Sequence, residues 1–304
     1  MTSNPFLLDS RHGDFKKIQA NRPDFDNSSS VPVTKSPNPA WKYGDGTNKK
    51  PNEGLQAIEI DPYHPDQRMI SNYKLLISGI PRPISFVSTI SKDGKENLAP
   101  FSYFQVVDHD PPILVIGFSA RESRPKDTRK NLLETGECVV SVVTEHMIEA
   151  VNATSLDVPH GVSEWAFSGL VATSSSTVKP NRVKDAIFSM EGKLLEMKQL
   201  DYGHEGDGKP HGALAIIKVT RFWIREDALT EARDHVDLSK LRPLVQLGGI
   251  SYGRVRETFE LPRPRLEDEM KDESKGLRSI LEGDAETQPA LDPSKLPHED
   301  LKHH

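Results

Sequence analysis

The sequence predicts a mainly β protein with few helices, built as a barrel between two loosely packed ends. Short runs of β-branched and aromatic residues recur at short spacing between residues 61 and 264. Helical periodicity is confined to a few short stretches, and proline and charge interrupt both ends of the chain. Many closely spaced strands with few helices favour a barrel over a sheet of alternating strands and helices.

The predicted strands share an apolar, β-branched or aromatic composition, and they cover residues 83–91, 97–104, 113–119, 138–144, 186–198 and 213–224. Asp93 and Gly94 supply a tight-turn signal between the first two of them. The stretch 113–119 is apolar on both faces, which is typical of a strand buried inside a barrel.

Three helices are expected, over residues 67–77, 128–135 and 145–153. The helix over 128–135 has the clearest limits, with Asp127 as the N-cap residue and Gly136 as the C-terminal stop. Near the C-terminus, Leu277 to Leu281 support one short helix at most.

The domain organisation follows from where proline and charge accumulate, and it divides the chain into a disordered or loosely packed N-terminal arm (1–60), one folded domain (61–264) and a charged, mostly disordered C-terminal tail (265–304). Chain ends of this composition bury too little apolar surface to offset the entropy of ordering them. Phe6, Phe15 and Trp41 leave open that parts of the arm lie along the domain.

Composition limits the classes of function. The 304 residues carry 39 basic and 45 acidic side chains, a formal net charge of −6, which does not favour binding to nucleic acid or an anionic membrane. The longest apolar stretch, Ile113–Phe118, is too short to cross a bilayer. The only cysteine, Cys138, has no partner for an internal disulfide, and no targeting segment stands out, so we expect a cytoplasmic protein.

The segment 121–136 runs from a predicted strand through a basic turn into a helix. A helix N-terminus carries unpaired N–H groups and a partial positive charge, and it can therefore hold a phosphate. Lys126 adds a full positive charge and Thr128 a hydroxyl donor. The residues alone leave open an ordinary solvated loop followed by a capped helix.

A second candidate segment is 97–104, with the sequence NLAPFSYF. Pro100 lacks an N–H group and suits a strand edge, where the backbone can face a planar polar ligand. Phe101, Tyr103 and Phe104 are suited to line an aromatic ring system. An ordinary barrel strand with aromatic core residues is the alternative.

The remaining motifs do not indicate a function. Residues 203–209 have the glycine and lysine spacing of a phosphate loop, but Pro210 stands where Ser or Thr must contact magnesium, so we expect a hairpin loop there. His204, His211 and His235 lack the paired spacing of a zinc site, and no metal is expected. Cys138 lies in an apolar strand, which argues against a cysteine nucleophile.

Taken together, these segments resemble the flavin reductase-like domain family. Seven short blocks occur in the family's order, among them RPISFVSTISKDGKENLAPFSYF, DPPILVIGFS and PKDTRKNLLETGECVVSVV, and they lie at residues 82–104, 110–119, 125–143, 152–155, 161–165, 241–252 and 260–264. The blocks span about two-thirds of the chain, and any one of them alone would be weak. The two chain ends have no counterpart in the resemblance.

The resemblance implies a split β-barrel that forms a homodimer and binds FMN in a groove partly lined by the partner subunit. It places Asn97–Ser102 at the isoalloxazine and ribityl parts, Lys126–Thr128 at the phosphate, and the remaining candidates beside the cofactor. Asp127 fits a helix cap better than a phosphate ligand, and Arg124 stands in for a second basic residue before the lysine. The cofactor-binding residues implied are Arg82, Thr89, Asn97, Ala99, Pro100, Phe101, Ser102, Ser119, Lys126, Asp127 and Thr128.

Three functions remain open from the sequence. The first is an FMN-dependent oxidoreductase that passes electrons from NAD(P)H through the flavin to an unknown second acceptor. The second is a non-catalytic module for flavin binding or delivery, and the third is a one-component enzyme acting on one organic substrate. Because the cofactor carries such chemistry, no catalytic acid or base is named.

Overall fold

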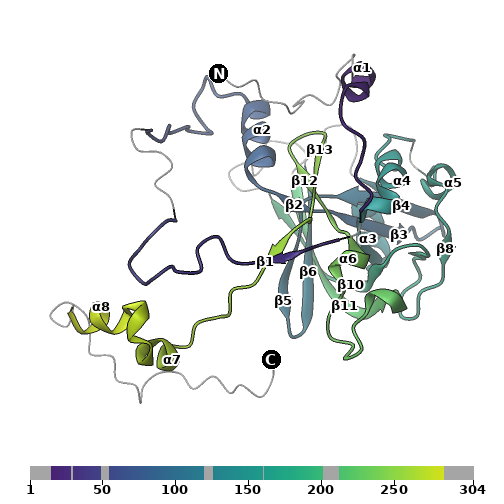
Figure 1. Ribbon diagram of the computed structural model, residues 1–304. Coiled ribbons are helices and arrows are strands. Elements are labelled where there is room, and N and C mark those ends of the chain that lie inside the picture. Colours follow the sequence, from purple (N-terminus) through teal and green to yellow (C-terminus); the bar gives the residue numbers. More distant parts are fainter. Residues whose placement is uncertain are drawn as a thin grey trace. The chain divides into compact units, whose positions relative to one another are not determined.

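The computed structural model describes residues 15–28, 30–48, 55–119, 126–159, 161–200 and 212–283 (Figure 1). The chain divides into two compact units. Unit 1 comprises Met1–Val31 with Asp61–Arg256, and unit 2 comprises Pro32–Ile60 with Glu257–His304. In the described residues, no helix combines the length and apolar character needed to cross a membrane.

Unit 1 is built on a seven-stranded antiparallel sheet in the order β4-β3-β7-β10-β11-β6-β5 (Figure 1). Its strands are β3 (Ser85–Ile90), β4 (Glu96–Phe101), β5 (Phe104–His109), β6 (Pro112–Phe118), β7 (Glu137–Val142), β10 (Phe188–Leu200) and β11 (Gly212–Ile224). Five of the six predicted strands each correspond to one strand of this sheet, and the strand-rich fold class is confirmed. Residues 203–209, expected to form a hairpin loop, lie outside the described residues; the strands β10 and β11 before and after them are antiparallel neighbours.

The predicted strand 97–104 is wrong in one respect, because the structure divides it into β4 and β5 at Ser102 and Tyr103. These two consecutive strands lie at opposite edges of the sheet. β4 pairs with β3 through the turn at Gly94, whose φ of 78° suits glycine, whereas β5 pairs with β6. The sheet thus curls so that its two edges are joined covalently without pairing to each other, which makes the barrel a split one.

Two apolar clusters stabilise the sheet. The first fills the barrel with residues from β3, β4, β6, β7, β10 and β11, including Phe101, Phe118 and Cys138. The second lies on the other face of β3 and β4, where Phe86 and Leu98 pack against Met147 and its neighbours. Because side chains alternate along a strand, β4 contributes Leu98 to one cluster and Phe101 to the other.

The helices of unit 1 are short, and they are α1 (Phe15–Ala20), α2 (Met69–Gly79), α3 (Asp127–Thr135), η1 (Glu145–Met147), α4 (Ile148–Ala153), α5 (Trp165–Ser168), η2 (Glu226–Ala228) and α6 (Leu238–Leu241). The three predicted helices correspond to α2, α3 and η1 with α4. Gly136 ends α3 with φ 70°, as expected. The expected cap is wrong: Lys126 occupies the N-cap position without a side-chain cap bond, and Asp127 is the first helical residue, where its charge favours the helix dipole.

Smaller sheets complete both units. In unit 1, β2 (Arg82–Pro83), β12 (Leu244–Leu247) and β13 (Ser251–Arg254) form one sheet, and β8 (Ala172–Thr173) pairs with β9 (Arg182–Val183). In unit 2, β1 (Val33–Thr34) runs parallel to β14 (Thr258–Phe259). Unit 2 also contains α7 (Leu266–Lys271), η3 (Glu273–Lys275) and α8 (Leu277–Gly283), so more helix forms near the C-terminus than the single short one expected. The first turn of α7 carries three acidic residues, whose charges favour the helix dipole. The ion pair Glu269–Lys275 joins α7 to η3.

Cys138 provides a test of the barrel core. It is fully buried, and burial, with the charge of Glu137, raises its pKa to about 12. Thiolate is the reactive form, so we expect thiol reagents at pH 8 to leave the native protein unlabelled and to label it once after denaturation in urea. Stoichiometric labelling of the native protein would show that this core opens.

Candidate functional site

Two adjoining pockets in unit 1 lie along β4, and both are lined by Lys126. We call the larger one the apolar cleft, after the aromatic and aliphatic side chains in part of its wall; polar side chains line the rest, and it encloses about 610 Å³ including its open mouth. It is lined by Tyr73, Ile77, Arg82, Pro100, Phe101, Ser102, Tyr103, Gly117, Phe118, Ser119, Lys126 and Gln246. We call the smaller one the polar pocket, of about 380 Å³; it is lined by Asn97, Ala99, Lys126, Asp127, Thr128, Thr154, Leu156, Asp157, Val158 and Glu164.

Arg82 ties together three walls of the apolar cleft. Its Nε donates to Ser102 Oγ at 3.2 Å, and its Nη1 donates to Ile77 O at 2.6 Å and to Ile80 O at 2.9 Å. Its Nη2 donates to Gly248 O at 3.3 Å. Four of its five N–H donors are thus directed at protein oxygens, so Arg82 shapes the cleft more than it serves as a free anion ligand.

Tyr103 enters the cleft because Gly117 leaves room for it. A Cβ atom on Gly117 would lie 3.0 Å from Cβ of Tyr103, and Gly117 N donates to Tyr103 O at 2.7 Å. Burial and the neighbouring Tyr73 raise the pKa of the Tyr103 phenol, so it is a neutral hydrogen-bond donor near pH 7.

The polar pocket rests on two side-chain hydrogen bonds between α3 and the β3–β4 hairpin. Asn97 Nδ2 donates to Thr128 Oγ1 at 2.9 Å, and Asn131 Nδ2 donates to Thr89 Oγ1 at 3.0 Å. Because Thr128 Oγ1 accepts from Asn97, its own hydrogen remains available to donate, and Thr128 lines the pocket. The start of α3 therefore adds a hydroxyl donor to its backbone N–H groups and to the charge of Lys126.

The outer edge of β4 presents acceptors more than donors. β4 is an edge strand, and Leu98 N donates to Glu164 Oε2 at 2.9 Å. Since antiparallel residues alternate between paired and outward-facing backbone groups, Glu96, Leu98 and Pro100 face outward. Leu98 N–H is satisfied by Glu164 and Pro100 has no N–H, which leaves the carbonyl groups of these two residues facing outward.

Glu164 is buried at the wall of the polar pocket. Burial raises the pKa of its carboxyl, and nearby Asp127 adds to the rise, while the Leu98 N–H bond and Lys126 oppose it. Its bond to β4 holds the edge strand in place beside the pocket. In the described residues, no group of three or more His, Cys, Asp and Glu side chains is arranged to hold a metal ion.

Most of the residues implied by the resemblance come together here. Ten of the eleven line the two pockets; Thr89 lines neither and contacts Asn131 behind them. Thr128 is only 1% exposed, so its side chain is buried and does not belong to a solvated surface. Arg124 lies outside the described residues. Whether these residues bind a cofactor stays a prediction.

Tyr103 was named from the sequence as a residue suited to line an aromatic ring system, but the other lining residues were missed, namely Tyr73, Ile77, Gly117, Phe118, Gln246, Thr154, Leu156, Asp157, Val158 and Glu164. Glu164, Thr154 and Gln246 lie in blocks that carried the resemblance, which was the available signal. Tyr73 and Ile77 come from a helix outside those blocks, and only the tertiary structure brings them to the cleft.

With this geometry in view, comparison with known proteins identifies the family. The model of the flavin reductase like domain matches residues 77–245, more than half of the chain. The chain belongs to the flavin reductase-like domain family.

Solved structures agree with this assignment. Nitrilotriacetate monooxygenase component B from Bacillus cereus is 33% identical, with a TM-score of 0.63 over 68% of this chain and 100% of that one. The 2-nitrobenzoate 2-nitroreductase NbaA from Pseudomonas fluorescens is 28% identical, with a TM-score of 0.57 over 66% of this chain and 93% of that one. A flavin reductase with a split barrel domain from Shewanella frigidimarina, 18% identical, has a TM-score of 0.59 over 68% of this chain and 100% of that one, which confirms the split-barrel fold.

Thr128 allows the polar pocket to be tested through stability. Thr128→Ala removes the acceptor of the buried Asn97 amide, and an unsatisfied buried donor costs about 1–3 kcal/mol. We expect urea unfolding of the flavin-free protein to show a loss of that size. Thr128→Ser, which keeps the hydroxyl, is the matched control and should retain most of the stability; equal losses in both variants would contradict the hydrogen bond.

Proposed function

We propose that this protein binds FMN across the apolar cleft and the polar pocket and acts as a flavin-dependent oxidoreductase. The observation that carries the proposal is that the two pockets share Lys126 as a lining residue, so that a cleft with aromatic side chains in its wall adjoins a charged helix start. A flavin mononucleotide has the same division, with a planar ring system at one end and a phosphate at the other.

The residues that line the two pockets fit FMN at both of its ends. The phosphate end matches the N-terminus of α3, Lys126 and the free hydrogen of Thr128. The ring end matches Phe101, Phe118 and Tyr103, which offer apolar surface. The outward carbonyl groups of β4 suit a ligand that carries an N–H and hydroxyl donors, as the ring and the ribityl chain do.

When bound, the flavin supplies the redox chemistry by accepting hydride from a nicotinamide and passing electrons on. The protein's own residues bind and orient it. Phe101 and Phe118 exclude water from one side, Arg82 fixes the cleft walls, and Lys126 balances the phosphate charge. We assign no catalytic acid or base.

NAD(P)H as electron donor and a separate electron acceptor complete the proposal. The apolar cleft is open, so a nicotinamide has a route to a bound ring. Two of the solved structures similar to this chain are named as a monooxygenase component and as a nitroreductase. These names support electron transfer out of the flavin to a second molecule.

A homodimer is part of the proposed function. Apolar side chains at the cleft and on the neighbouring α2 and β5 are exposed, among them Met69 (81%), Leu76, Tyr103, Val106 and Val107 (56%). β5 is an edge strand of the sheet, and a soluble monomer rarely leaves an apolar edge uncovered. A second copy placed there would bury these side chains and close the mouth of the cleft.

The test of function begins with ligand binding. We expect the protein to bind FMN more tightly than riboflavin, since each charge-assisted hydrogen bond to the phosphate contributes about 1.5–3 kcal/mol. Titration by flavin fluorescence measures both affinities. Lys126→Ala should reduce the preference for FMN, and equal affinity of the wild type for both flavins would remove the phosphate assignment.

The same preparation then decides between catalysis and storage. We expect the FMN-loaded protein to oxidise NADH or NADPH, followed at 340 nm, with a faster rate when an artificial acceptor is present. Tight FMN binding with no oxidation of either nucleotide would leave a flavin-binding or delivery module and overturn the oxidoreductase proposal.

The dimer is tested by mass. We expect light scattering after gel filtration to give twice the 33.9 kDa chain mass for the wild type. Val106→Glu should shift the mass towards the monomer, because it buries a charge in the expected interface. Lys193→Glu, a charge change on the strand β10 elsewhere in the sheet, is the control, and a monomeric wild type that binds FMN tightly would rule the dimer out.

A further inference from the structure

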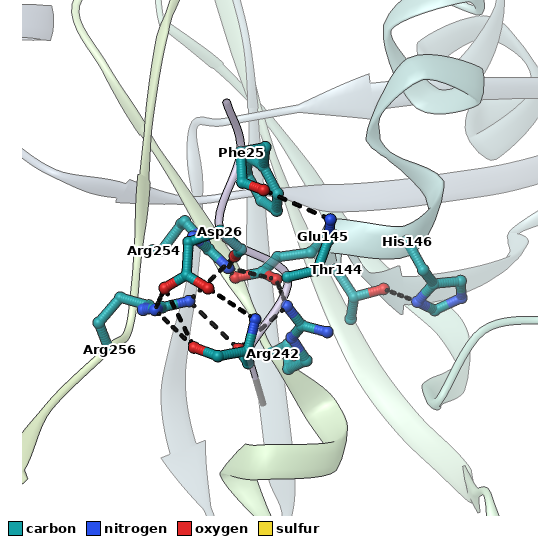
Figure 2. A network of polar contacts seen from close by, with 10 residues as sticks. Phe25, Asp26, Thr144, Glu145, His146, Arg242, Arg254 and Arg256 are labelled. Atoms are coloured by element: carbon teal, nitrogen blue, oxygen red, sulfur yellow. Dashed lines mark hydrogen bonds and ion pairs between the residues drawn. The ribbon is translucent and has the colours of Figure 1, made fainter. Parts of the chain in front are cut away.

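Two arginines, Arg242 and Arg254, pair with one buried carboxylate at the base of the β12–β13 hairpin (Figure 2). Glu145, whose side chain is 6% exposed, accepts from Arg254 through Nε and, at 2.9 Å, through Nη2, and it pairs with Arg242. Burial alone would raise the pKa of Glu145, but the bond and charge of Arg254 with the charge of Arg242 outweigh it and lower the pKa. Glu145 therefore stays ionised near pH 7 and orients both guanidinium groups.

A short piece of the N-terminal arm lies on these arginines, and we call Phe25–Ser28 the strap. Asp26 O accepts from Arg254 Nη2 at 2.8 Å, and the Arg254 guanidinium lies 4.0 Å from the centre of the Phe25 ring. The Asp26 carboxylate pairs with Arg256 (Figure 2). Arg256 also donates to Ser28 O at 3.3 Å and to Ser28 Oγ at 3.0 Å.

The strap contacts residues on both sides of the hairpin's base. Arg254 ends β13 and pairs with Leu244, the first residue of β12, while Arg242, which donates to Ser28 O at 3.5 Å, lies just before β12. A single exposed ion pair contributes little to stability. Here, however, the strap contacts the oriented arginines through backbone carbonyls, a carboxylate and an aromatic ring at the same time. The strap thus joins a segment early in the chain to residues more than 200 positions later.

The other end of this hairpin is a wall of the apolar cleft. Gln246 lines the cleft and pairs with Arg82, and Gly248 bonds both Arg82 Nη2 and, through its N–H, Ile77 O at 2.8 Å. Because β12 and β13 pair along their whole length, from Leu244–Arg254 to Leu247–Ser251, we infer that a shift at the base also moves the tip. The position of the base therefore bears on the shape of the cleft.

We propose that the strap holds the base of the β12–β13 hairpin in place. It thereby positions Gln246 in the wall of the apolar cleft and Gly248 against Arg82. Asp26, Arg254 and Arg256 are then positioning residues for flavin binding, although none of them lines the cleft. The flavin part of the proposal rests on the proposed function, whereas the clamping of the hairpin does not. The proposal also gives residues 25–28 a role in the folded domain, whereas the sequence predicts a disordered or loosely packed arm there.

Charge reversal tests the strap in the full-length protein. Asp26→Arg adds a fourth arginine to the cluster and should repel the strap. Asp24→Arg makes the same charge change two residues earlier, at an exposed carboxylate, and is the matched control. The double variant Asp26→Arg with Arg256→Asp restores an ion pair of opposite polarity.

Two readouts are compared, amide hydrogen exchange of residues 23–28 and 244–254 without flavin, and FMN affinity. We expect Asp26→Arg to speed exchange in both segments and to weaken FMN binding about five- to tenfold, a common size of coupling between sites. The Asp24→Arg control should match the wild type, and the charge swap should recover much of the loss.

Several results would overturn the proposal. If exchange of residues 23–28 is unchanged in Asp26→Arg, the ion pair does not hold the strap. If the strap is released while exchange of 244–254 and FMN affinity stay within about twofold of wild type, it does not position the hairpin. A wild type that binds no FMN contradicts the proposed function instead, and the exchange of the flavin-free variants then still decides whether the strap clamps the hairpin.

Discussion

The unpaired seam between β4 and β5 is the constraint on which the rest of this structure depends. Consecutive strands occupy the two edges of one sheet, so the chain closes the barrel covalently while the edges stay apart. An open edge leaves backbone groups without partners, which is costly when they are buried. Here Pro100 removes one donor and Glu164 satisfies the next, and both candidate pockets lie along this same edge.

The polar pocket owes its form to satisfied buried groups. Asn97 and Thr128 would each carry a penalty if buried alone, and their mutual bond removes it while leaving a hydroxyl hydrogen for a ligand. The same bond joins β4 to the start of α3. The strand edge and the helix N-terminus are therefore held as one unit, which is what a ligand with a ring at one end and an anion at the other requires.

The walls of the apolar cleft come from distant parts of the chain. Arg82 connects α2, the β4–β5 corner and the β12–β13 turn, and the proposed strap holds the base of that hairpin. The rigidity of these walls therefore depends on the hydrogen bonds of Arg82 and on the contacts of the strap. A point change far from the cleft therefore has a physical route to flavin affinity, through the hairpin.

The sequence by itself determined the strand-rich class, the positions of β3, β6, β7, β10 and β11, the helix ended by Gly136 and ten residues that line the pockets. Local signals suffice for these, because strand periodicity, turn glycines and short blocks are properties of neighbouring residues. It failed at Asp127, since whether a residue caps a helix or begins it depends on one backbone angle, and at the single strand 97–104, since partner exchange at Ser102 depends on both edges of the sheet. Only the tertiary structure decided the burial of Thr128, the role of Glu164 and the meeting of Phe25 and Asp26 with Arg254 and Arg256, because each joins residues far apart in sequence whose contact no local pattern encodes.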